Sequence, residues 1–318
     1  MARATLIALL ALLALVCASL LAGVAGLDAR ALLSSGEGWE LIRDSRLPRT
    51  LAALLTGAAL AVAGQIMQLI AQNRFVEPMT AGTGQSAVLG ILLTSVLLPG
   101  AALPVKMALA ALTALAGSLG FFAVTRRLPP TQPLLVPLVG LVYGGVIGAA
   151  TAYAAFQADM LQYLEIWLGG EFSGTMRGRY ELLWLAGLAA LASYLVADQL
   201  SILGLGEAVS LNLGLNYRQV VLAGLVVIAL VSGLTVVTVG MIPFVGLVVP
   251  NLVSRVAGDN LRRSLPVTAL AGAALVLAAD LAGRLLIHPF EIPAATVIGI
   301  LGAAVFLWML YGRGAHAA

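Results

Sequence analysis

The chain has 318 residues, of which 61% are hydrophobic and 10% charged, so it is not an ordinary soluble domain. Its formal net charge of +3 is small and dispersed, which argues against a nucleic-acid surface, and one cysteine with two histidines excludes a disulfide framework and a His or Cys metal cluster. A helix needs about 20 apolar residues to cross a bilayer core. We therefore predict an all-α polytopic membrane protein without a metal or other cofactor.

Apolar segments follow one another along the chain, beginning at residues 4–26. This first run exceeds the usual signal-peptide core of about 7–15 residues, so we expect a retained first helix. An even number of spans places both termini on one side, and arginines in the loops only slightly favour a cytoplasmic N-terminus. The pattern predicts about ten spans, at residues 4–26, 48–70, 80–98, 103–124, 134–157, 181–198, 219–238, 243–257, 266–287 and 295–312.

The second span opens with RLPR, in which Arg46 and Arg49 bracket a proline. This places two guanidinium groups on the outer side, where the positive-inside rule disfavours them. An outer face with so many arginines needs a reason other than topology.

A glycine-rich stretch in the middle of the chain could be mistaken for a nucleotide-binding loop, but the sequence excludes one. The glycines of GTGQSAVLG, from Gly82, are typical of helix packing or a turn, because no strand precedes them. A Walker A loop needs a lysine after its glycines, and the only lysine, Lys106, stands in LPVKMALA. The chain is therefore not a P-loop ATPase, and without clustered catalytic residues we expect no enzymatic activity.

A polar interruption separates the sixth and seventh spans. The segment ADQLSILGLGEAVSLNLGLNYRQV, residues 197–220, has three glycine breakers around short amphipathic stretches. It fits a bent pair of helices on the membrane surface, or an ordinary polar loop. A transporter driven by an outside motor needs a docking element, and this segment is a candidate.

The last spans contain a bent helix and a charged pair. Pro243 and Pro250 predict that the short eighth span is bent or broken. Asp280 is the one carboxylate found within the spans, and Arg284 follows it on the same helical face. Asp280 is either a proton or ion site or, as we favour, half of an ion pair near the outer end of its span.

Four blocks of sequence together resemble the permease subunits of bacterial ABC importers for iron–siderophore, haem and cobalamin. The resemblance covers nearly the whole chain and implies the type II ABC importer permease fold in one transmembrane domain, residues 1–318. It also implies a multi-pass protein of the bacterial cytoplasmic (inner) membrane with both termini cytoplasmic. The blocks are RLPRTLAALLTGAALAVAGQIMQ with NRFVEPMTAGTGQSA, ILGLGEAVSLNLGLN, IPFVGLVVPNLVSRVAGDNLRRSLP, and ADLAGRLLIHPFEIPAATVIGILGAAVFLWML.

The resemblance also implies partners. These are two cytoplasmic ABC ATPase subunits, an extracytoplasmic substrate-binding protein, and a second permease subunit in a homodimer or a paired heterodimer. Membrane lipid surrounds the complex. In this family Arg46, Arg49 and Arg284 match arginines that face outward and pair with acids on the binding protein. A guanidinium stays charged and holds a carboxylate through two hydrogen bonds, which suits that role.

Two further sets of residues carry over from the family. Leu205, Gly206 and Glu207 match the loop that couples the permease to its ATPase, here at about residues 199–218. Thr131 and Gln132, in RRLPPTQPLLVPL, match the inner gate, although an ordinary loop explains them as well.

One departure bears on the substrate. Many family members have histidine where GLVVPN places Asn251, so a titratable group is lost and a pH-dependent role is not expected there. The blocks look most like the branch for catecholate-type ferric siderophores, which we favour as the substrate. A cobalamin or haem importer is the alternative, and an ion-coupled secondary transporter working alone is a third.

Overall fold

The structure is a computed structural model that describes residues 2–22, 36–128, 134–258, 260–287 and 289–311. Within these ranges the chain is helical and has no strand. The elements in chain order are α1 (Ala2–Leu21), α3 (Gly36–Leu41), the π-helical turn η1 (Ile42–Arg46), α4 (Leu47–Ile70), α5 (Thr83–Leu97), α6 (Leu103–Thr125), α7 (Leu135–Gln157), α8 (Leu161–Leu168), α9 (Leu183–Leu195), α10 (Ala197–Leu203), α11 (Glu207–Asn212), α12 (Tyr217–Val239), α13 (Val245–Ala257), α14 (Leu261–Leu286) and α15 (Ala294–Tyr311).

Each of the ten predicted spans corresponds to a helix, and the all-α prediction is confirmed. Five helices are long and apolar enough to cross a membrane, and α9 with α10 forms a sixth span bent by 72°. Four shorter apolar helices, in α1, α5, α13 and α15, make up the rest. The count of ten therefore holds only when short and bent helices are included.

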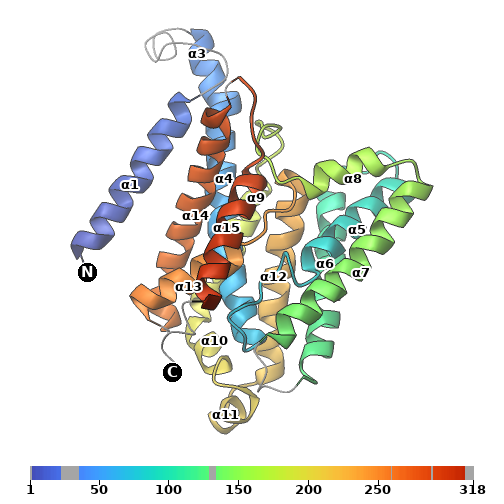
Figure 1. Cartoon of the computed structure of the whole chain (residues 1–318), viewed down its shortest axis with the longest axis vertical. Coiled ribbons are helices and arrows are strands. Elements are labelled where there is room, and N and C mark those ends of the chain that lie inside the picture. The colour runs from blue at the N-terminus through green and yellow to red at the C-terminus, as the bar shows by residue number, and fades with distance from the viewer. Residues whose placement is uncertain (1, 23–35, 129–133, 259, 288, 312–318) are drawn as a thin grey trace.

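Figure 1 separates two ends of the bundle. At one, called the α3 end, lie α3 and the connection from α14 to α15. At the other, called the α11 end, lie α10 and α11. The first residues of α1 and the last residues of α15 point toward the α11 end. The two candidate sites described below lie at these opposite ends.

Helix α4 is the central element, and 78% of the apolar window around it is buried. Glycines allow its neighbours to approach closely. A Cβ on Gly57 would overlap the carbonyl oxygen of Gly272 in α14, and a Cβ on Gly64 would overlap the backbone of Gly246 in α13. Close backbone approach at small residues is the usual way in which membrane helices pack. Helix α4 thereby fixes α13 and α14 together.

Helix α13 is short but continuous, so the break expected from its prolines is not seen. It begins after Phe244, which has a left-handed φ of +67°, and it contains Pro250. The backbone N–H of Phe244 donates to Oε1 of Glu77 at 2.6 Å. Glu77 is 1% exposed, so the loop from α4 to α5 supplies the carboxylate that caps this buried helix start.

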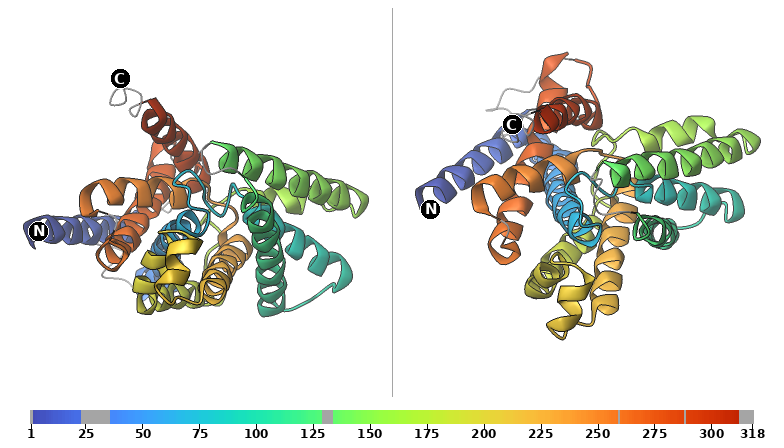
Figure 2. Two further views of the ribbon diagram at one scale, coloured as in Figure 1. Left: turned by 90° about the horizontal axis from the view of Figure 1, so that it is seen from below. Right: turned by 60° about the horizontal axis from the view of Figure 1, so that its bottom comes forward.

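Two helices project from this core. Figure 2 shows α1 and α7 at opposite margins of the molecule. Only 17% of the apolar window of α7 is buried, and Leu138, Leu141, Val142 and Val146 are exposed on it. An apolar helix left this bare needs lipid or another protein chain against it.

Candidate functional site

The outer arginines predicted from the sequence lie together at the α3 end. Arg46 ends η1, Arg49 lies in the first turn of α4, and Arg284 lies in the last turn of α14. Arg49 is held between two carboxylates. Its Nε and Nη2 donate to Oδ1 of Asp280 at 3.1 and 2.8 Å, and its Nη1 and Nη2 donate to the Glu291 oxygens at 3.1 and 2.8 Å.

Arg284 and Arg46 attach α1 to this cluster. Arg284 pairs with Asp280 at 2.7 Å and donates to the hydroxyl and the carbonyl oxygen of Ser19 at 2.6 and 3.1 Å. Arg46 donates to the carbonyl oxygens of Leu20 and Leu21 at 2.9 and 2.7 Å. These carbonyls belong to the last turn of α1, where they lack partners within the helix.

The paired residues form a neutral group, which we call the outer cluster: Arg49, Arg284, Asp280 and Glu291. The ion-pair interpretation of Asp280 is confirmed, and Arg49 is a further partner that the spacing did not reveal. The side chains differ in access to solvent, since Asp280 is 2% and Glu291 23% exposed. Glu291 is therefore the only member whose partner can be exchanged without opening the core.

The segment predicted to couple to an ATPase, residues 199–218, is called the coupling segment here and lies at the opposite end. It forms a bent pair of short helices, α10 and α11, which agrees with the first of the two sequence interpretations. Gly206 joins them with a φ of +101°, a conformation that favours glycine. Glu207 begins α11 and is exposed. Leu205 is 60% exposed, and further large apolar side chains are exposed beside it: Val209, Leu211 and Leu213.

Three other residues named from the sequence have different outcomes. Thr131 and Gln132 lie outside the described residues. Asn251 is buried, and its amide donates to the carbonyl oxygens of Arg74 and Leu247, both at 2.7 Å. It joins α13 to the loop after α4.

Glu77 is the polar residue that sequence reasoning missed, because it was assigned to a loop. Asp280 is thus not the only deeply buried carboxylate. The signal was present in NRFVEPMTAG, where a lone acid stands among apolar residues and precedes a proline. The sequence does not show that this loop folds back against α13.

Comparison with known proteins identifies the family of this chain. The model of the FecCD transport family matches residues 10–312. The chain belongs to the FecCD transport family. The match spans both the outer cluster and the coupling segment, so each is a part of the family's fold.

Curated relatives share much of the chain. A petrobactin import system permease of Bacillus subtilis is 42% identical over 86% of each chain. A ferric-anguibactin transport system permease of Vibrio anguillarum is 40% identical over 88% of this chain and 89% of its own. A vitamin B12 import system permease of Vibrio cholerae is 36% identical over 85% and 82%.

A solved structure shares the fold. It is a chain of a proposed metal-chelate type ABC transporter in an inward-facing conformation, with a TM-score of 0.81 and 23% identity. The match covers 98% of this chain and 100% of that one. The expected ABC importer permease fold is confirmed.

Proposed function

We propose that this chain is the membrane-spanning permease of a binding-protein-dependent ABC importer for a ferric siderophore. The identity to relatives supports a siderophore as the substrate. The petrobactin and anguibactin permeases are 42% and 40% identical to this chain, whereas the vitamin B12 permease is 36% identical. The chain itself has no catalytic role, and ATP is hydrolysed by the partner subunit.

The test is uptake of iron-55 carried by a panel of siderophores that includes petrobactin and anguibactin, with labelled cobalamin beside them. Cells with and without this chain are compared. Loss of uptake for one siderophore supports the proposal, whereas loss of cobalamin uptake alone means that the substrate is wrong while the family assignment stands.

We place the ATPase at the α11 end, which is then cytoplasmic. Leu205, Gly206 and Glu207 lead into α11, and the exposed leucines there form an apolar surface that suits burial against another protein. Glu207→Arg is expected to weaken ATPase association, measured by co-purification. Glu165→Arg is the control, since Glu165 is an exposed acid of α8, outside the coupling segment.

We place the binding protein at the α3 end, with docking through Arg46, Arg49 and Arg284. All three already have partners within the chain, and Arg46 and Arg284 are each 5% exposed. Arg49 reaches an exchangeable partner in Glu291, so an acid of the binding protein takes the place of Glu291 on Arg49. Glu291→Gln is expected to strengthen binding-protein association, because it removes the competing carboxylate, and weaker binding contradicts this arrangement.

A second permease subunit, of the same or a related sequence, covers the exposed apolar face of α7.

A second candidate function, of a different class, is an ion-coupled transporter that works alone. Among the residues that the structure describes, the two buried carboxylates Asp280 and Glu77 are the features that favour it. It predicts that proteoliposomes of the chain alone accumulate substrate when an ion gradient is imposed, whereas the importer predicts no accumulation without ATP and the ATPase.

A further inference from the structure

A cavity of about 1270 Å³ lies at the α11 end, lined mainly by α6, α12 and residues 70–75 at the end of α4 and in the loop after it. Helices α6 and α12 touch further toward the other end, where a Cβ on Gly233 would meet the backbone of Ala111. Arg126, directly after α6, follows Ala111 by fifteen residues, and Arg218 precedes Gly233 by fifteen residues on α12. Both arginines are therefore about 22 Å along their helices and at the same level. Both line the cavity.

The cavity has apolar walls on its membrane side. Leu119 and Phe122 line it from α6, and Leu222 and Leu225 line it from α12. Leu119 is 41% and Leu222 48% exposed, so the cavity is open at these two walls. Apolar walls with such an opening suit hydrocarbon chains better than a soluble ligand.

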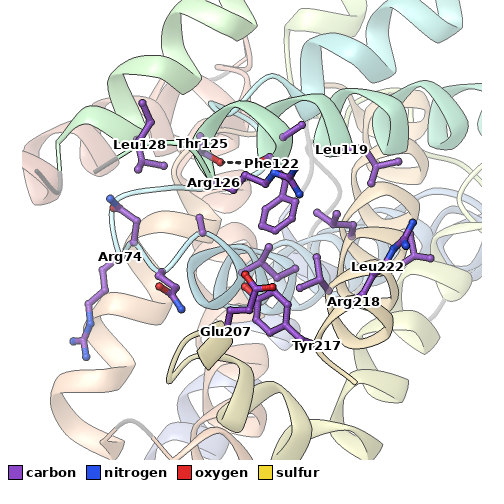
Figure 3. Close-up of a pocket in the computed structure, with 18 of the residues that line it drawn as sticks. Arg74, Leu119, Phe122, Thr125, Arg126, Leu128, Glu207, Tyr217, Arg218 and Leu222 are labelled. Atoms are coloured by element: carbon purple, nitrogen blue, oxygen red, sulfur yellow. Dashed lines mark hydrogen bonds between the residues drawn. The ribbon is translucent and has the colours of Figure 1, made fainter. Parts of the chain in front are cut away.

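The rim toward the α11 end is basic. Figure 3 shows Arg126 with Phe122 on one side of the cavity and Glu207 with Tyr217 on the other, while Arg218 lies beside Leu222. Arg126 and Arg218 are exposed, and neither has an ion-pair partner within the described part of the chain. Two unpaired guanidinium groups above apolar walls match an anionic head group carrying acyl chains.

We propose that this cavity binds an anionic phospholipid of the cytoplasmic leaflet, with its phosphate between Arg126 and Arg218 and an acyl chain against Leu119 and Leu222. The inference rests on the proposed orientation, in which the α11 end is cytoplasmic. Basic pockets between membrane helices on that side are suited to acidic head groups. Glu207, which begins α11 within the coupling segment, stands on the opposite rim, so the lipid lies directly beside the ATPase contact.

The first experiment uses the permease purified with its ATPase and measures lipid binding by native mass spectrometry. The probe is phosphatidylglycerol, with phosphatidylcholine as the neutral comparison. Arg126→Gln with Arg218→Gln is compared with Arg127→Gln with Arg263→Gln, a pair that removes the same charge from exposed arginines outside the cavity. We expect the cavity pair to bind phosphatidylglycerol about tenfold more weakly than the control pair, as loss of charge-assisted hydrogen bonds implies.

A second variant keeps the charge and fills the cavity. Leu222→Trp places a larger side chain at the opening, and Leu230→Trp is the control on the exposed face of the same helix outside the cavity. Weaker phosphatidylglycerol binding in Leu222→Trp alone supports the site. Equal losses in cavity and control variants, or no binding while the ATPase is attached, would each overturn it.

Siderophore uptake is measured on the same preparations after reconstitution. If uptake fails in every lipid while phosphatidylglycerol binding follows the expected pattern, the transport proposal is wrong and the lipid site stands. If uptake is normal and both arginine pairs bind phosphatidylglycerol alike, the lipid site is wrong and the transport proposal stands.

Discussion

The outer cluster contains one buried carboxylate and one part-exposed carboxylate, which differ in how much they depend on their ion pairs. Asp280 lies between Arg49 and Arg284 and is 2% exposed, whereas Glu291 pairs with Arg49 from the loop before α15 and is 23% exposed. A buried charge depends on its partner, whereas a part-exposed one is largely satisfied by water. Reversing the charge of Arg49 would therefore disrupt the fold as well as any docking.

This difference predicts unequal losses of stability. Arg49→Met is expected to lower the free energy of unfolding by about 3–5 kcal/mol, because it leaves Asp280 buried with one cation fewer. Glu291→Gln is expected to cost about 0–1 kcal/mol, as for exposed ion pairs. Denaturant titration of the purified protein in detergent micelles measures both. Similar losses in the two variants would mean that Asp280 does not depend on Arg49.

The capping role of Glu77 gives a second prediction. Glu77→Ala leaves the buried N–H of Phe244 without its acceptor and is expected to cost about 1–3 kcal/mol. Glu77→Gln keeps an oxygen acceptor and is expected to retain most of the stability and of the uptake activity. If Glu77→Gln abolishes uptake while the protein stays folded, the negative charge itself is required, and the capping role is insufficient.

For individual residues, the sequence predicted an ion pair only where the two residues are close together in the chain. Asp280 and Arg284 are four residues apart on one helix, so their pairing follows from the period of the helix. Arg49 and Asp280 are 231 residues apart, and Glu77 is 167 residues from Phe244. Nothing local in the sequence indicates that these residues meet.

At the scale of helices, the sequence predicted positions better than lengths. Continuous apolar runs bounded by charges and prolines located a helix for each of the ten predicted spans, and the glycines around residue 205 located the bend between α10 and α11. The sequence did not show which helix is central. That depends on the glycine contacts of α4, which require the facing glycines of α13 and α14 to be in register.

Those contacts give a prediction for helix packing. Gly64→Val is expected to destabilise the fold by about 1–3 kcal/mol or more, because the added carbons overlap the backbone of Gly246, which cannot rotate away. Gly299→Val in α15 is the control, since a Cβ there meets nothing within 4 Å. Detergent-solubilised protein is compared by its thermal unfolding midpoint. A loss in Gly299→Val as large as in Gly64→Val would show that glycine itself, rather than the close approach, is required.

At the scale of the whole molecule, the proposed orientation predicts which surfaces face outward. In a Cys17→Ser background, Gly174→Cys lies in the loop before α9 and Asn212→Cys lies at the end of α11. An impermeant maleimide added to intact spheroplasts is expected to label Gly174→Cys and to reach Asn212→Cys only after lysis. The reverse pattern would invert the molecule, and with it the assigned ATPase and binding-protein faces.

The long separation between Arg49 and Asp280 also has a consequence for synthesis. At about 5–20 residues per second, roughly 10–50 s pass between the emergence of Arg49 and that of its buried partner. Until α14 is made, Arg49 in the first turn of α4 lacks this buried partner. The outer cluster can therefore close only late in synthesis, after the ninth span has been added.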